Sequence, residues 1–128
     1  MIMSGWNFDA LIYDLFIGKV DRKLYSEILN SISFKDDMFI DEFGCGTGNL
    51  TRLFPPNVNV RSIDMSSLAI KRAKRKSQDN VFFTVADFFK VIPERKPDVI
   101  IASRSLYGKS LDKSLRKISD SLREKGYA

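Results

Sequence analysis

The chain has 128 residues, 44% of them hydrophobic, which suits one packed core and predicts a single domain over residues 1–128. One cysteine and no histidine exclude a disulfide framework, a histidine-based catalytic triad and a Cys/His metal site. The 21 Lys and Arg against 16 Asp and Glu give a net charge of +5, which suits an anionic partner but identifies none. No apolar run of about 18 residues and no basic, export-type leader occurs, so we expect a cytoplasmic protein without membrane contact.

The first 35 residues precede any strand-like segment. Their apolar side chains recur at steps of three and four positions between Phe8 and Leu29, and Gly18 interrupts the pattern. This spacing predicts two short amphipathic helices. We therefore expect residues 1–35 to form an N-terminal helical segment of the domain.

Apolar strand-like runs alternate with helical segments over residues 36–128. The expected strands are residues 38–43, 58–63, 81–85 and 99–102, and the expected helices are residues 48–54, 67–77 and 111–122. Ser66 is a suitable N-cap for the second of these helices. Such alternation is typical of an α/β fold, a doubly wound and mostly parallel sheet with flanking helices.

A glycine-rich turn follows the first expected strand, in the sequence Glu42-Phe43-Gly44-Cys45-Gly46-Thr47-Gly48. Glycine lacks a Cβ atom, so this turn can adopt positive φ and let a ligand lie against its backbone. Such a turn between a strand and a helix is where α/β proteins bind nucleotide-like ligands. The spacing is GxGxG, and Asn49 stands where the dinucleotide fingerprint GxGxxG has its last glycine, which argues against NAD.

Acidic residues end the next two strands, Asp64 in the segment SIDMS and Asp87 in the segment VADFF, and the fourth strand follows Pro97-Asp98. Together with the glycine turn, these motifs resemble those of the class I S-adenosylmethionine-dependent methyltransferases over nearly the whole chain. The resemblance implies a Rossmann-like sheet of which this chain supplies about four of the usual seven strands. It also implies methyltransferase activity, with S-adenosylmethionine as methyl donor and S-adenosylhomocysteine as product.

The resemblance places a donor site at the turn and the strand ends. Asp64 lies 64 minus 44, or 20, positions after the first glycine and can accept from both hydroxyls of a ribose. Asp87 can accept from an adenine amino group and Phe88 can pack on the ring, while Glu42 either orients the glycine loop or faces the donor's ammonium. The expected cofactor-binding residues are Glu42, Gly44, Cys45, Gly46, Gly48, Asp64, Met65, Asp87, Phe88 and Ser103.

Several of these residues also have a purely structural interpretation. An acid at a strand end is often a helix cap or a solvated loop residue, and only the three acids together favour a binding site. Cys45 is interpreted as a small residue in a tight turn with no catalytic role, because no histidine is present to activate it. Asp41 stands where the resembling family has an apolar residue, so the first strand end is expected to be more polar or shifted by one residue.

The acceptor side is defined less closely by the sequence. The candidate catalytic residues are Tyr13, Ser103, Arg104 and Tyr107, and Tyr13-Asp14 resembles a pair in the leading segment of the family. We expect a small-molecule acceptor and no metal. The alternatives are an inactive cofactor-binding or regulatory module that needs a partner subunit, a nucleotide-dependent oxidoreductase, and an RNA methyltransferase.

Two segments of the sequence indicate how the protein could contact other molecules. The basic run at residues 71–76 is interpreted as the solvated outer face of a helix, because no aromatic residues interleave with its charges as nucleic-acid binding would favour. The strand at residues 99–102 would form a bare sheet edge without the later strands of the family, and such edges are normally covered. We therefore expect self-association, a partner chain or a rearranged terminus at that edge.

Overall fold

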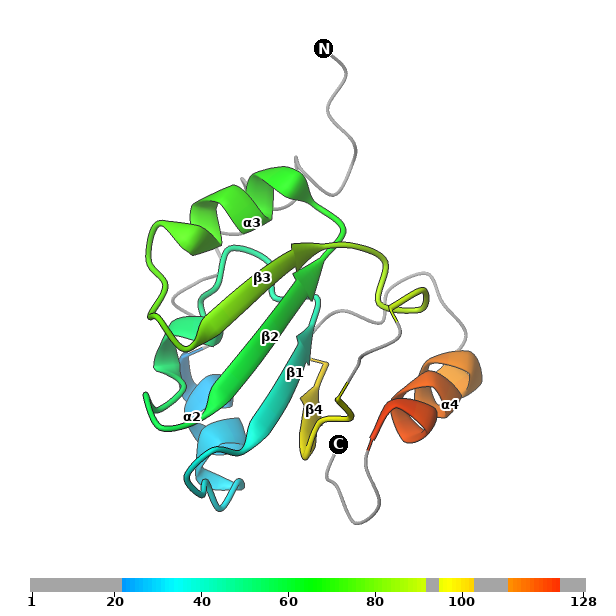
Figure 1. Ribbon diagram of the computed structural model, residues 1–128, viewed down its shortest axis with the longest axis horizontal. Coiled ribbons are helices and arrows are strands. Elements are labelled where there is room, and N and C mark those ends of the chain that lie inside the picture. Colours follow the sequence, from blue (N-terminus) through cyan, green and yellow to red (C-terminus); the bar gives the residue numbers. More distant parts are fainter. Residues whose placement is uncertain (1–21, 92–94, 103–110, 123–128) are drawn as a thin grey trace.

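The computed structural model describes residues 22–91, 95–102 and 111–122. Its centre is one sheet of four parallel strands in the order β3-β2-β1-β4 (Figure 1). The strands are β1 (Phe39–Phe43), β2 (Asn59–Asp64), β3 (Val81–Val85) and β4 (Val99–Ile101). Because all pairings are parallel, the carboxyl ends of the strands meet at one edge of the sheet, and the α/β fold class is confirmed.

Helical segments flank the sheet. They are α2 (Arg22–Asn30), the 3-10 helix η1 (Thr51–Leu53), α3 (Ser67–Lys74) and α4 (Leu111–Ser121). Tyr25 of α2 lies in a core cluster with Leu50 and Phe54, which flank η1, whereas Ile118 of α4 lies in a second cluster with Phe43. The helices thus divide between the two faces of the sheet, as a doubly wound fold requires.

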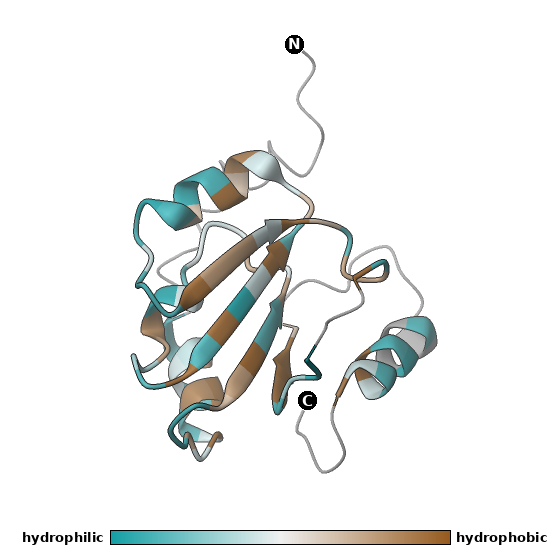
Figure 2. Cartoon of the chain, in the orientation of Figure 1, coloured by the Kyte–Doolittle hydropathy of each residue, from teal (hydrophilic) through white to brown (hydrophobic). Residues whose placement is uncertain are grey.

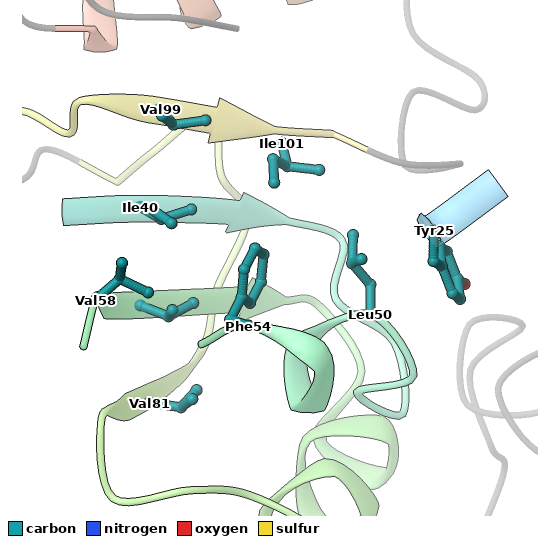
Figure 3. Close-up of a cluster of buried hydrophobic side chains, with 9 residues drawn as sticks. Tyr25, Ile40, Leu50, Phe54, Val58, Val81, Val99 and Ile101 are labelled. Atoms are coloured by element: carbon teal, nitrogen blue, oxygen red, sulfur yellow. The ribbon is translucent and has the colours of Figure 1, made fainter. Parts of the chain in front are cut away.

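The core is built on the two-residue period of the strands. Ile40 of β1 and Val60 of β2 are fully buried in the first cluster, which Figure 3 shows between the sheet, η1 and α2. Phe43 of β1 and Ile63 of β2 lie in the second cluster. Each central strand is therefore covered on both faces, which is typical of parallel sheets.

The helix expected at residues 48–54 is much shorter in the structure. Only η1 forms, because Gly48 has φ +85° and the turn continues to Leu50, while Pro55 follows the helix closely. The helix expected at residues 67–77 ends at Lys74. The first of the two expected N-terminal helices lies outside the described residues, and the second corresponds to α2.

Basic residues occupy the outer face of α3, as the sequence predicts. Ala69, Ile70 and Ala73 are buried, whereas Lys71 and Lys74 are exposed. In Figure 2 the second half of α3 is accordingly hydrophilic, while brown segments lie along the strands. None of the helices among the described residues is long and apolar enough to cross a membrane.

Strand β4 is an edge of the described sheet, and its side chains are buried within the chain. Val99 and Ile101 belong to the first core cluster and Ile100 to the second, so no apolar side chain of β4 is left exposed. Asp98 fixes the start of the strand, because its Oδ2 accepts from the Phe39 N–H at 2.8 Å and its own N–H donates to the Phe39 carbonyl at 2.7 Å. Coverage of the outer backbone edge by a partner stays a prediction.

Candidate functional site

The glycine turn between β1 and η1 has left-handed backbone at all three glycines. Their φ angles are +72° at Gly44, +56° at Gly46 and +85° at Gly48, values that other residues rarely adopt. The Gly44 N–H donates to the Ile63 carbonyl at 2.7 Å, which holds the start of the turn against β2. The sequence therefore needs glycine here for conformation alone, before any ligand is considered.

Gly46 and Gly48 differ in what surrounds them. A Cβ atom on Gly48 would lie 3.0 Å from the Cβ and 3.3 Å from the Cα of Ala73, so this glycine allows close packing on α3. Among the described residues, a Cβ atom on Gly46 would meet nothing within 4 Å. The turn thus packs against the protein at Gly48 and presents an open side at Gly46, where a ligand can approach its backbone.

Asp64 joins the end of β2 to this turn. Its Oδ2 accepts from the Gly46 N–H at 2.9 Å, and its Oδ1 accepts from the Ser66 N–H at 2.8 Å. Burial raises the pKa of this carboxyl, and the bonds from the Ser66 and Gly46 N–H groups oppose the rise. Each carboxylate oxygen can accept more than one hydrogen bond, so Asp64 retains capacity for ligand hydroxyls.

Glu42 lies beneath the turn and is 3% exposed. Its Oε2 accepts hydrogen bonds from the Thr51 hydroxyl of η1 and from the Ser62 hydroxyl of β2, the latter at 2.9 Å. Burial raises the pKa of Glu42 to about 7, the two hydroxyls lower it, and the nearby Asp64 carboxylate adds to the rise. These contacts join Glu42 to η1 and β2, and both roles expected for it, toward the loop and toward the donor's ammonium, stay predictions.

The residues after β3 form a local turn. Asp87 Oδ1 accepts from the Phe89 N–H at 3.0 Å, and the Asp87 carbonyl accepts from the Lys90 N–H at 2.9 Å, so Asp87 has the capping contacts of a structural residue. Phe88 is buried, with its ring stacked on those of Phe43 and Phe89 at 4.8 and 4.4 Å between centroids. Their contacts with an adenine ring stay predictions.

Two other predicted residues flank the turn and β2. Met65 follows Asp64 directly and is 49% exposed, so its side chain is available to a ligand. Cys45 is buried inside the turn, and burial, together with the Glu42 and Asp64 carboxylates, raises the pKa of its thiol. Because the thiolate is the reactive form, these surroundings support the expectation that Cys45 has no catalytic role.

The predicted acceptor-side residues are not placed by the structure. Tyr13, Asp14, Ser103, Arg104 and Tyr107 lie outside the described residues. Among the residues that the structure does describe, no group of three or more Cys, Asp or Glu side chains could hold a metal ion.

Sequence reasoning did not identify three side chains that shape this region: Thr51, Arg61 and Ser62. Ser62 pairs in register with Glu42, and a polar residue at an otherwise apolar strand position was the available signal. Arg61 pairs in register with Asp41. The Asp41 side chain is 1% exposed and forms an ion pair with the partly buried guanidinium of Arg61. Strand β1 is therefore polar at Asp41 and is not shifted by one residue.

A parallel sheet with a glycine turn after β1 and an acid at the end of β2 defines an α/β protein of the nucleotide-binding type. Comparison of the sequence with known protein families shows which family of α/β proteins the chain belongs to. The family described as "Methyltransferase domain" matches residues 34–128, so the chain belongs to this methyltransferase family.

Curated relatives agree with that assignment. The chain is 29% identical to a malonyl-[acyl-carrier protein] O-methyltransferase of Priestia megaterium, over 98% of this chain and 48% of the relative. It is 34% identical to a trans-aconitate 2-methyltransferase of Escherichia coli, over 81% of this chain and 41% of the relative. The chain thus spans less than half the length of these curated relatives.

The fold is shared with solved methyltransferase structures. A DhpI complex with S-adenosylhomocysteine matches with a TM-score of 0.78 and 22% identity, over 94% of this chain and 62% of that one. The N-methyltransferase NodS of Bradyrhizobium japonicum, also in complex with S-adenosylhomocysteine, matches with a TM-score of 0.76 and 20% identity, over 89% and 62% of the two chains. At these identities the similarity shows the fold.

Proposed function

We propose that this chain binds S-adenosylmethionine at the glycine turn and forms the donor-binding portion of a methyltransferase that acts on a small molecule. The observation that carries the proposal is the bond from Gly46 N–H to Asp64, which brings the expected ribose acid to the open side of the turn. Family membership supports it, as do the S-adenosylhomocysteine complexes among the structural neighbours.

The residues of the site fit such a ligand. Gly46 leaves room for close approach, and Asp64 retains acceptor capacity for a pair of adjacent hydroxyls. Glu42 supplies a carboxylate beneath the turn, which suits the positive charge of the donor. The exposed Met65 side chain offers an apolar surface beside Asp64 for the base. We assign Asp87 and Phe88 to the adenine side of the site.

S-adenosylmethionine, when bound, supplies a methyl group on a sulfonium, and its departure leaves a neutral thioether. The chain's own residues therefore have to position the reacting groups and exclude water, with little acid–base work at the leaving group. Glu42 and Asp64 orient the donor from opposite ends of the turn in this proposal. We assign the acceptor side to Tyr13, Ser103, Arg104 and Tyr107.

The acceptor is proposed to be a small molecule. Two relatives are named for the acceptors malonyl-[acyl-carrier protein] and trans-aconitate, and these names support the choice. In the described structure the basic outer face of α3 carries no aromatic side chain among residues 67–76, which disfavours an RNA acceptor. The cytoplasmic location expected from the sequence belongs to the same proposal.

Thermal melts of the purified chain with saturating S-adenosylhomocysteine or NAD test donor binding. We expect a cooperative melt whose midpoint rises with S-adenosylhomocysteine and does not move with NAD, because a ligand of the native state stabilises by mass action. A rise with NAD alone would identify a nucleotide-dependent oxidoreductase instead. Cooperative melts that move with neither ligand would overturn the proposal.

Turnover is tested by release of S-adenosylhomocysteine from S-adenosylmethionine, with trans-aconitate or malonyl-[acyl-carrier protein] as trial acceptors. Acceptor-dependent release that Asp64→Ala abolishes supports the enzyme. The exposed Lys74→Ala variant is the control for substitution elsewhere in the fold. Donor binding without release for any acceptor would favour the inactive cofactor-binding module.

A further inference from the structure

Glu42 is held by hydroxyl groups from two different elements. Thr51 begins η1 and Ser62 lies in β2, and both donate to the same oxygen, Oε2. All three side chains are buried. One carboxylate oxygen therefore ties together β1, β2 and the segment after the glycine turn.

Among the described residues, the groups with the largest effect on the pKa of Glu42 are the hydroxyls of Thr51 and Ser62 and the carboxylate of Asp64. Ile101 of β4 pairs with it in register and is apolar, and Tyr25 of α2 is buried on the same side of the sheet. Two titratable groups interact with the Glu42 carboxyl: the Asp64 carboxylate, which opposes its ionisation, and the thiol of Cys45, which is neutral. The two hydroxyls are thus the main groups described that favour the carboxylate.

We propose that Thr51 and Ser62 are positioning residues for donor binding, which keep Glu42 ionised and fixed beneath the glycine turn and so tie donor affinity to the proton state of Glu42. The inference rests on the proposed function, because it takes a cationic group of the donor as the ligand of this charge. A hydroxyl that donates to a carboxylate stabilises the ionised form over the protonated one.

Burial raises the pKa of Glu42 to about 7 although both hydroxyls are present. Loss of either hydroxyl removes a group that lowers this pKa, so a larger fraction of Glu42 is protonated at neutral pH. A protonated Glu42 offers no charge to a cationic group. Donor affinity is therefore expected to rise with pH through the neutral range, and to need a higher pH when a hydroxyl is absent.

Calorimetric titration of the full 128-residue chain with S-adenosylhomocysteine, from pH 5.5 to 8.5, tests the proposal. Thr51→Val and Ser62→Ala each remove one hydroxyl, and each should shift the midpoint of the affinity profile upward by about one pH unit. At pH 7 this shift corresponds to about five-fold weaker binding, which recovers toward the wild-type value at high pH. Thr51→Ser keeps a hydroxyl and should restore the wild-type profile.

Two further variants separate positioning from general damage. Ser66→Ala removes a buried hydroxyl that caps α3, and it should leave the pH midpoint unchanged. Glu42→Gln cannot ionise and should flatten the profile in this range. Affinity that falls equally at every pH in Thr51→Val and Ser62→Ala would overturn the inference and leave only a structural role.

The same titrations distinguish failure of this inference from failure of the proposed donor binding. If the wild-type chain binds no S-adenosylhomocysteine at any pH, donor binding is overturned, and the unfolding midpoint of the unliganded variants against pH then decides the role of the hydroxyls. A profile displaced to higher pH in Thr51→Val and Ser62→Ala supports their control of the Glu42 charge. Profiles that coincide with the wild-type one overturn it.

Discussion

The side chain of Asp64 and the backbone of Gly46, 18 residues apart in sequence, are joined by a hydrogen bond of 2.9 Å. This bond fixes the end of β2 to the middle of the glycine turn, and the second Asp64 oxygen holds the Ser66 N–H at the start of α3. One carboxylate therefore sets the relative position of the turn and the helix on which the proposed donor site depends.

Replacing Asp64 tests this connection. Asp64→Ala leaves two backbone N–H groups without their acceptor and should lower the free energy of unfolding by about 1–3 kcal/mol. Asp64→Asn keeps one carbonyl oxygen and should lose less. Urea denaturation measures both changes, and equal stability of Asp64→Ala and the wild type would contradict the assigned contact.

Alanine substitutions at Gly46 and Gly48 should affect stability and ligand binding in opposite proportions. Gly48→Ala places a Cβ atom 3.0 Å from Ala73 at φ +85° and should destabilise the fold by roughly 2–4 kcal/mol. The methyl group of Gly46→Ala meets no atom of the described residues within 4 Å, and the variant should cost about 1 kcal/mol for its left-handed backbone. Relative to its stability loss, Gly46→Ala should weaken S-adenosylhomocysteine binding more, since its methyl group enters the open side.

Urea denaturation and calorimetric titration of both glycine variants give the comparison. Each variant acts as the control for the other, because both add one methyl group to the same turn. Equal stability of the two variants would contradict the packing of Gly48 on α3.

Breaking the ion pair between the buried Asp41 and the partly buried Arg61 should destabilise the fold much more than replacing both residues by apolar ones. Arg61→Met leaves the Asp41 carboxylate buried without its partner and should destabilise the fold by about 3–5 kcal/mol. The double variant Asp41→Leu and Arg61→Met should recover most of that loss, because no buried charge remains. Arg75→Met changes an exposed position and should stay within about 0.5 kcal/mol of the wild type. A double variant no more stable than Arg61→Met would contradict this account.

Glu42 should make the fold less stable as the pH rises. Its pKa is about 7 in the folded chain against an ordinary value of 4.5. Between pH 4.5 and pH 7 Glu42 is ionised in the unfolded chain but still protonated in the folded one, so a rising pH shifts the equilibrium toward the unfolded chain. The resulting loss in the free energy of unfolding is roughly 3 kcal/mol. Asp41 and Asp64, whose pKa values are also raised, add to the same trend.

Denaturation midpoints at pH 5 and pH 8 measure this dependence. Glu42→Gln has no proton to lose and should show a smaller fall in stability than the wild type over the same interval. An identical fall in both proteins would show that Glu42 ionises in the folded chain much as it does in the unfolded one.

The N-cap of α3 has a separate contribution. The Ser66 hydroxyl accepts from the Ala69 N–H at 3.1 Å, and Ser66→Ala should cost about 1 kcal/mol of stability. Ser67→Ala, at the exposed next position, is the matched control and should change stability by less than about 0.5 kcal/mol. Thermal melts of the two variants at one pH provide the test, and similar midpoints would contradict the capping role.

Much of the fold is predictable from the sequence because its signals are local. The apolar run at Val81–Val85 coincides with β3 in the structure, and Ser66 caps the helix that it was expected to cap. The expected helix at residues 48–54 was wrong in length because the left-handed backbone at Gly48 is incompatible with a helix that begins there. Apolar spacing does not report such a local constraint.

Part of the candidate site is likewise predictable from the sequence, and part of it is not. The sequence by itself determined the glycine turn and the acids that end the strands, since glycine conformation and strand periodicity are properties of neighbouring residues. Only the tertiary structure decided that Glu42 receives the hydroxyls of Thr51 and Ser62, and that Asp41 pairs with Arg61. The contacts of Ser62 and Arg61 depend on the register of β1 against β2, and the contact of Thr51 depends on how the segment after the glycine turn packs on β1. Packing across the whole sheet sets that register, and the residues adjacent to each side chain do not.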